Sequence, residues 1–214
     1  MITGVAVVPA APLLLPEYVG RHDPGAALRD RCTSAVHEAV AGAERVVVVT
    51  GTDRPTHTTR PPLGERVARL LLADGPPDDV VLVPTDADPE VCRAAGERLA
   101  AGSTPTALVV AADGSARRGE KAPGHLDERA FAVDEAVTAA LAAPDLRRLL
   151  DLDPALCADV LFGGRAALQV LGGALATGAG GPAYRTVSLH TEDPFGVRYV
   201  VAVLRVLGPH GQEQ

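Results

Sequence analysis

The sequence predicts an α/β fold with a mostly parallel central sheet flanked by helices on both faces, and the last two strands can form an antiparallel edge. Runs rich in Val, such as RVVVVT at residues 45–50, are apolar at almost every position, which is typical of strands buried on both faces. These runs alternate with segments of helical periodicity, the order that parallel βαβ units produce. A hydrophobic content of 47% provides enough apolar side chains for such a core.

The first half of the chain contains three expected strands and three expected helices. A β-branched run ends at Pro9, and the following PAAPLLLPE is expected to be an irregular exit. The third helix has the clearest boundaries, because Asp88 is a suitable N-cap, Pro89 a suitable first residue and Gly102 a suitable end. The expected strands are Ile2–Val8, Arg45–Thr50 and Val80–Val83, and the expected helices are Ala26–Val40, Leu63–Ala73 and Asp88–Ala101.

The second half begins with a fourth buried strand and ends with two strands joined by the loop HTEDPFG. Because that loop is short, the last two strands can pair antiparallel. The expected strands are Thr106–Ala111, Tyr184–Leu189 and Val197–Leu207, and the expected helices are Asp127–Ala142, Asp145–Leu150, Pro154–Phe162 and Arg165–Ala176. The whole is expected to form one domain, residues 1–208, followed by a frayed tail at residues 209–214.

Composition and charge exclude several classes of protein. The net charge is −7 and no basic stripe is present, which argues against binding to nucleic acid. No apolar run is long enough to span a membrane. The three cysteines, at positions 32, 92 and 157, are widely spaced and odd in number, as expected for reduced thiols in a cytoplasmic protein. Whether the protein forms a homo-oligomer stays open, because the pattern of apolar residues does not distinguish exposed apolar helices from core helices.

The polar segment at residues 112–127 is the strongest candidate for a functional site. It leaves a buried strand, which is where an α/β protein usually places its chemistry. Asp113, Ser115, Lys121 and His125 are the candidate catalytic residues. The alternative is a solvated loop whose charges are incidental, and Ser115 lacks the G-x-S-x-G frame of a serine hydrolase.

A second set of side chains could bind a metal ion. The loops after the other strands bring His57, His190, Glu192 and Asp53 to the same expected edge of the sheet. Two His and a carboxylate would suit Fe(II) and oxygen chemistry. No pair has tight ligand spacing such as HxxxH, and Glu192, close to Pro194, can equally be part of a turn.

Several segments together carry a resemblance to a known family. They are VVPAAPLLLPEY, RVVVVTGTD, LVVAADGSARR, AFAVDEAV, LDLDPALCADVLFGGRAALQVLGGAL and HTEDPFGVRYVVAV. In this order they resemble the catalytic subunit of the class III extradiol ring-cleavage dioxygenases, above all the small actinobacterial members of that family, and more distantly the Memo-like proteins. The resemblance covers most of the chain and implies an α/β fold and, in active members, a non-haem Fe(II) that cleaves catechols with O₂.

The residues that the resemblance makes functional are only partly present. In the family's P-H-P-P motif the His is an iron ligand, and Ala10 stands at that position. In the motif that resembles G-D-x-S-H the His is the catalytic acid–base group, and Ala116 stands there. A methyl group neither coordinates iron nor transfers a proton, so the usual ring cleavage is expected to be lost or altered.

The remaining family positions fit loosely. The second ligand His falls near Asp53, with His57 four residues later, and the late acidic ligand corresponds to Glu192 or Asp193. With His190, these residues could rebuild a metal site.

Three functional hypotheses follow. The first is an extradiol-type enzyme with a rebuilt Fe(II) site. The second is a pseudoenzyme without metal or cofactor that binds a small anionic or aromatic molecule, or a partner protein, in the same crevice. Arg117, Arg118 and Lys121 would then bind the anion, because guanidinium groups pair with carboxylate and phosphate. The third, a metal-independent hydrolase or isomerase using the catalytic candidates of the 112–127 segment, has the least support.

Overall fold

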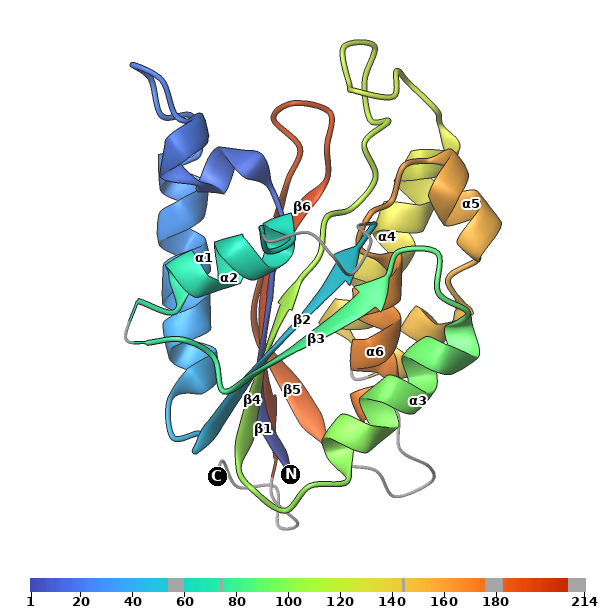
Figure 1. The fold of residues 1–214 in the computed structure, drawn as a ribbon. Helices are drawn as coiled ribbons and strands as arrows, with labels where there is room; N and C mark the ends of the chain where they lie inside the picture. The colour runs from blue at the N-terminus through green and yellow to red at the C-terminus, as the bar shows by residue number, and fades with distance from the viewer. Residues whose placement is uncertain (54–59, 74, 144, 176–182, 208–214) are drawn as a thin grey trace.

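A computed structural model describes residues 1–53, 60–73, 75–143, 145–175 and 183–207. Six strands form one mixed sheet in the order β3-β2-β4-β1-β6-β5 (Figure 1). The first four strands of that order are parallel, whereas β6 is antiparallel to both of its neighbours. The strands are β1 (Ile2–Val8), β2 (Arg45–Thr52), β3 (Asp79–Pro84), β4 (Thr106–Ala111), β5 (Tyr184–Glu192) and β6 (Tyr199–Val206).

Helices cover both faces of the sheet, so the molecule has three layers (Figure 1). On one face lie α1 (Ala26–Val40) and α2 (Leu63–Leu71), and on the other α3 (Pro89–Ala100), α4 (Arg129–Ala142), α5 (Pro154–Asp159) and α6 (Arg165–Leu175). Three 3₁₀ turns, η1 (Pro12–Leu14), η2 (Pro16–Tyr18) and η3 (Leu146–Asp151), complete the described elements. None of the described helices is long and apolar enough to cross a membrane.

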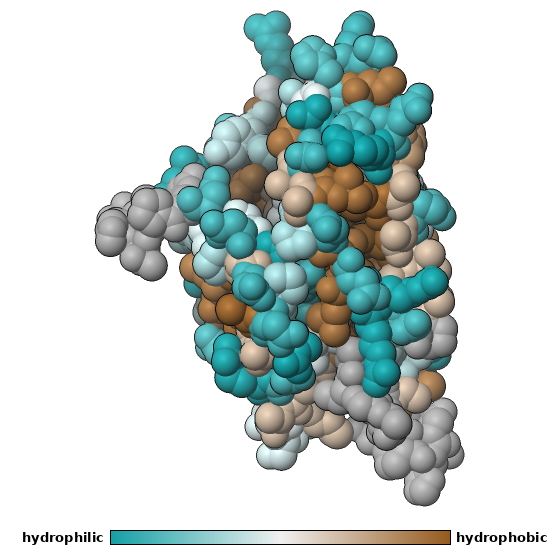
Figure 2. All heavy atoms as spheres, turned by 90° about the vertical axis from the view of Figure 1, so that its right-hand side faces the viewer, coloured by the Kyte–Doolittle hydropathy of each residue, from teal (hydrophilic) through white to brown (hydrophobic). Residues whose placement is uncertain are grey.

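Two apolar clusters, one on each side of the sheet, form the core. Every residue of β1 is buried, as expected for a strand between two helical layers. The cores are built mainly from Val, Leu and Ala, and the three cysteines are free and buried within them. The helical face seen in Figure 2 presents hydrophilic side chains with hydrophobic ones between them.

The fold class predicted from the sequence is confirmed, including the antiparallel edge. The predicted cap of α3 is also confirmed, because the Asp88 Oδ1 accepts a hydrogen bond of 2.9 Å from the Glu90 backbone N–H. Several predicted bounds differ by one to three residues, and one difference bears on the site: β5 continues to Glu192, so His190 and Glu192 lie in a strand and not in a loop. The reason is that these residues pair with the start of β6, where Glu192 lies opposite Tyr199. The expected frayed tail lies outside the described residues.

Helices α3 and α6 approach each other so closely that a glycine is required. A Cβ added to Gly96 would lie 2.1 Å from the Val170 carbonyl oxygen and 2.4 Å from the Ala174 nitrogen. Both are backbone atoms, which cannot rotate away. This contact fixes α6 against the sheet, and the start of α6 forms part of the site described below.

We expect Gly96→Ala to lower the free energy of unfolding by about 1–3 kcal/mol, the usual cost of overpacking. Alanine favours a helix over glycine by about 1 kcal/mol, so a loss would show that the backbone clash outweighs helix propensity. Urea unfolding measures the change. The control is Gly102→Ala just beyond α3, where an added Cβ meets no atom within 4 Å. Equal stability of the two variants would contradict the close packing of α3 on α6.

Candidate functional site

The carboxyl ends of the parallel strands enclose a cavity of about 300 Å³. This strand-end cavity lies where the exits of β1, β2, β3 and β4 meet the start of α2 and the turn before α6. Open α/β sheets commonly bind their ligands at this edge. Its lining residues are Ala10, Thr50, Gly51, Asp53, Pro62, Leu63, Gly64, Thr85, Ala111, Ala112, Asp113 and Gly163.

Close packing of glycine against the strand ends shapes one wall of the cavity. A Cβ on Gly64 would lie 2.0 Å from the Thr50 Oγ1, so only glycine allows α2 to begin this near β2. The Thr50 hydroxyl in turn donates a hydrogen bond of 3.0 Å to the carbonyl of Ala111, which fixes the end of β4. The start of α2 is therefore held directly over the strand ends.

The opposite wall is the turn that leads into α6. The Gly164 backbone N–H donates a hydrogen bond of 2.8 Å to the Asp113 carbonyl, and this bond ties the turn to the exit of β4. An added Cβ on Gly163 would meet no atom within 4 Å. Since Gly163 lines the cavity, a side chain at this position would extend into open space there.

Asp113 is the charged group best placed to act in the cavity. It is half-buried, and its Oδ1 accepts a hydrogen bond of 2.9 Å from the Ala10 backbone N–H. Burial raises the pKa of the Asp113 carboxyl to about 7, although the bond from Ala10 favours the ionised form. In the described part of the chain it forms no ion pair with Arg, Lys or His. Asp113 can therefore change its protonation state near neutral pH.

A buried cation lies behind the cavity wall. Arg165, the first residue of α6, is only 3% exposed, yet it has no carboxylate partner among the described residues. Its guanidinium donates hydrogen bonds of 2.7 Å to the carbonyls of Thr85 and Ala87 and to the side chain of Gln169. Arg165 does not line the cavity itself, but Thr85, one of its hydrogen-bond partners, does.

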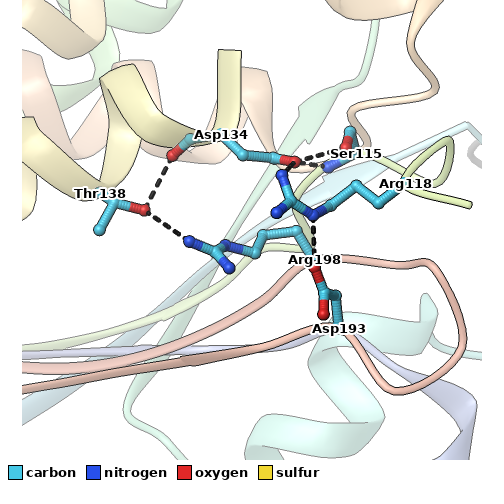
Figure 3. A network of polar contacts seen from close by, with 6 residues as sticks. All are labelled: Ser115, Arg118, Asp134, Thr138, Asp193 and Arg198. Carbon is cyan, nitrogen blue, oxygen red and sulfur yellow. Dashed lines mark hydrogen bonds and ion pairs between the residues drawn. The ribbon is translucent and has the colours of Figure 1, made fainter. Parts of the chain in front are cut away.

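The predicted catalytic residue Ser115 lies in a separate polar network (Figure 3). Ser115 is fully buried, and its hydroxyl donates a hydrogen bond of 2.5 Å to the Asp134 Oδ2. Arg118 also contacts that carboxylate, at 3.1 Å, and binds Asp193 at 2.6 Å. The arrangement joins α4, the 112–127 segment and the β5–β6 hairpin, so its clearest role is to hold these parts together.

Backbone hydrogen bonds fix the 112–127 segment to the same hairpin. Gly114 donates to the carbonyl of Arg198 and Arg198 donates to that of Ser115, both at 2.8 Å, and Arg118 donates to that of Gly196 at 3.0 Å. The segment is thus tied to the hairpin and is not a loosely solvated loop in this part.

The structure does not bring the other candidates of this segment to the cavity. His125 and Lys121 are exposed, and neither lines it. Of the predicted anion ligands, Arg118 is bound to two carboxylates and stacks 4.3 Å from the centre of the Phe131 ring. The Nε of Arg117 is buried and has no partner among the described residues. Catalytic or ligand-binding roles for these residues stay predictions without geometric support.

The predicted metal ligands do not form a group in the described structure. His190 lies 3.2 Å from Glu192, Nε2 to Oε2, on the edge strand β5. Asp53 lines the cavity, which His190 and Glu192 do not. His57 lies outside the described residues. Among the residues that are described, no three His, Cys, Asp or Glu side chains are placed to share a metal ion.

The two alanines at family positions lie where the resemblance implies functional histidines. Ala10 lines the cavity beside Asp113, and Ala116 lies farther along the segment, with its backbone N–H bound to the Val160 carbonyl at 3.2 Å. The donor set of the cavity consists of oxygen atoms of Asp53, Asp113 and threonines, without an imidazole among the described residues. The described residues therefore do not fit the iron site that the resemblance implies.

Comparisons with known proteins do not assign a family. No family model matches the chain, and no curated protein matches it significantly. The crystal structure of an uncharacterized protein, JW3007 from Escherichia coli K12, is similar over 95% of this chain and 99% of that chain, with 16% identity and a TM-score of 0.46. A likeness of this degree identifies neither a family nor an activity.

Several residues of the site are not evident from the sequence. The sequence indicates Gly163 and Gly164 only as a break between helices, and it does not single out Gly64. Arg165 could have been singled out from the sequence, because it is the one charged residue in the mostly apolar segment RAALQVLGGAL. Asp134 offers a similar signal within AFAVDEAV.

Replacing Asp113 by Asn should stabilise the protein at alkaline pH. The folded-state pKa of about 7 exceeds the ordinary value for Asp, so the folded protein holds its proton more tightly than the unfolded chain. The wild type therefore loses stability as pH rises from about 4 through 7, whereas Asp113→Asn does not lose this contribution. Urea unfolding at pH 5 and pH 8 measures it, and Asp30→Asn, an exposed site on α1, is the control. An Asp113→Asn advantage that is equal at both pH values would contradict a raised pKa.

Proposed function

We propose that this chain is a relative of the class III extradiol dioxygenases that binds a small anionic aromatic molecule in the strand-end cavity and no longer cleaves it. The observation that carries the proposal is the cavity itself. It lies at the edge of the sheet where α/β proteins commonly bind ligands, and it contains the Asp113 carboxyl, whose pKa is about 7. The buried Arg165, which has no carboxylate partner among the described residues, is bound to the lining residue Thr85.

The size and lining of the cavity favour a small ligand. A volume of about 300 Å³ is at the lower end for small-molecule sites, which suits a molecule with one ring. Ala, Pro, Leu and Gly supply apolar surface, while Thr50, Thr85 and Asp113 supply polar atoms. The uncompensated charge of Arg165 favours a ligand that carries a negative charge.

The residues also support the loss of ring cleavage. Alanine replaces the His of the P-H-P-P motif at the cavity and the acid–base His of the second motif. Either change removes a group that the usual reaction needs. A rebuilt Fe(II) site is the second candidate function, and it depends on His57 and on a movement of His190 or Glu192 toward the cavity.

Obstructing the cavity should weaken ligand binding. We expect Gly163→Leu to weaken binding of 3,4-dihydroxybenzoate at least about tenfold, because a large side chain at this exposed lining residue would obstruct the cavity. The control is Gly20→Leu, an exposed position where an added Cβ also meets nothing within 4 Å. Isothermal titration calorimetry measures both. Unchanged affinity in a folded Gly163→Leu variant would place the binding site elsewhere.

Iron loading separates the two candidate functions. After anaerobic addition of Fe(II) and desalting, we expect elemental mass spectrometry to find far less than one iron per chain, and no difference in His57→Ala or His190→Ala. The reason is that the described cavity offers no imidazole ligand. Stoichiometric iron that is lost in His57→Ala would instead support a rebuilt dioxygenase site, and catechol cleavage would then be the expected activity.

A further inference from the structure

The strand-end cavity contains two ionisable side chains among its described lining residues, Asp53 and Asp113. Asp53 is exposed at the rim, whereas Asp113 is half-buried and held in place by the Ala10 backbone N–H. One carboxyl oxygen of Asp113 thus has a fixed partner. The other has no hydrogen-bond partner among the described residues.

The charged groups around Asp113 come from several elements, and none of the described cations is paired with its carboxylate; the Nε of Arg198, beside Gly114, has no partner among the described residues. From β6, the buried Tyr199 interacts with Asp113, and its pKa is raised by burial and then by the carboxylates of Asp113 and Glu192. From α4, Asp134 is paired with Arg118. No described cation pairs with Asp113, so the bond from the Ala10 backbone N–H is the one described contact that favours its ionised form.

The remaining neighbours complete this picture. From α2, Glu65 is buried and paired with Arg69 at 2.8 Å. From α6, Arg165 is directed to the carbonyls of Thr85 and Ala87 and does not bind Asp113. A ligand that entered the cavity would therefore meet the Asp113 carboxyl, while the guanidinium of Arg165, which has no carboxylate partner among the described residues, lies outside the lining and stays bound to carbonyls.

We infer that Asp113 selects the ligand by its charge: in its neutral form it donates its O–H to an anionic oxygen of the ligand, and in its ionised form it repels the same group. This inference rests on the proposed function, and it adds the group that decides which ligands bind. Binding of the anion then includes the uptake of one proton by Asp113 whenever that carboxyl is ionised in the free protein.

Ligand affinity then depends on pH, in a direction that is set by the charge of the ligand. An anion binds to the protonated protein, so its affinity falls as pH rises through the pKa of Asp113, by up to about tenfold per pH unit above it. A cation would show the opposite dependence, because it would bind to the ionised carboxylate. A neutral ligand that accepts a hydrogen bond would lose affinity less steeply.

The experiment compares three single-ring probes that differ mainly in charge: benzoate, benzamide and benzylammonium. Calorimetry at pH 5.5 and pH 8.5 uses the wild type, Asp113→Asn and Asp151→Asn, an exposed carboxylate outside the cavity. We expect benzoate to bind best and to lose at least about tenfold in affinity at pH 8.5 in the wild type and in Asp151→Asn. In Asp113→Asn the amide N–H replaces the O–H, so benzoate should bind equally at both pH values.

The failures can be told apart. Tighter binding of benzylammonium than of benzoate, or a pH effect that persists in Asp113→Asn, would overturn the role of Asp113 and leave the cavity as a binding site. Binding of none of the three probes by folded wild-type protein at either pH would overturn the proposed function itself.

Discussion

The burial of one carboxyl group at the end of a parallel strand determines what this site can do. Asp113 directly follows the two alanines at the end of β4, where the strand ends meet, and the Ala10 backbone N–H from the exit of β1 fixes it. Burial without an ion pair moves its pKa to about 7, into the range where a small change in surroundings changes its charge. An ionised and solvated aspartate at this position would give a site of different selectivity.

The rest of the structure holds this carboxyl and its cavity in place. Gly96 allows α3 and α6 to touch at the backbone, and α6 then carries the Gly163–Gly164 turn to the exit of β4. On the far side, the Ser115–Asp134–Arg118–Asp193 network and the backbone bonds to the hairpin hold the segment after Asp113. The polar segment is therefore firmly held against the rest of the fold, and in the proposed function only its first residues contact the ligand.

The sequence predicts the fold better than the site. Continuous apolar strands and helical periodicity are local signals, and they located β1, α1 and β4 at their observed bounds. The position of Asp113 at a strand exit is also a local feature, so the sequence could place it at this edge of the sheet. The partners of Ser115 and the position of His125 outside the cavity depend on how distant segments pack, which periodicity does not contain. Gly163 matters because of empty space beside it, and Arg165 because it lacks a counter-ion among the described residues, and neither property can be read from residue order.

The central claim is that the cavity beside Asp113 holds an anion and not iron. A crystal structure of protein exposed anaerobically to both Fe(II) and 3,4-dihydroxybenzoate tests it most directly. The account predicts the ligand in the strand-end cavity, with one carboxylate oxygen at hydrogen-bond distance from the Asp113 carboxyl and no metal beside Ala10. An iron atom in the cavity coordinated by His57 and a carboxylate, with the catechol oxygens bound to it, would contradict the account.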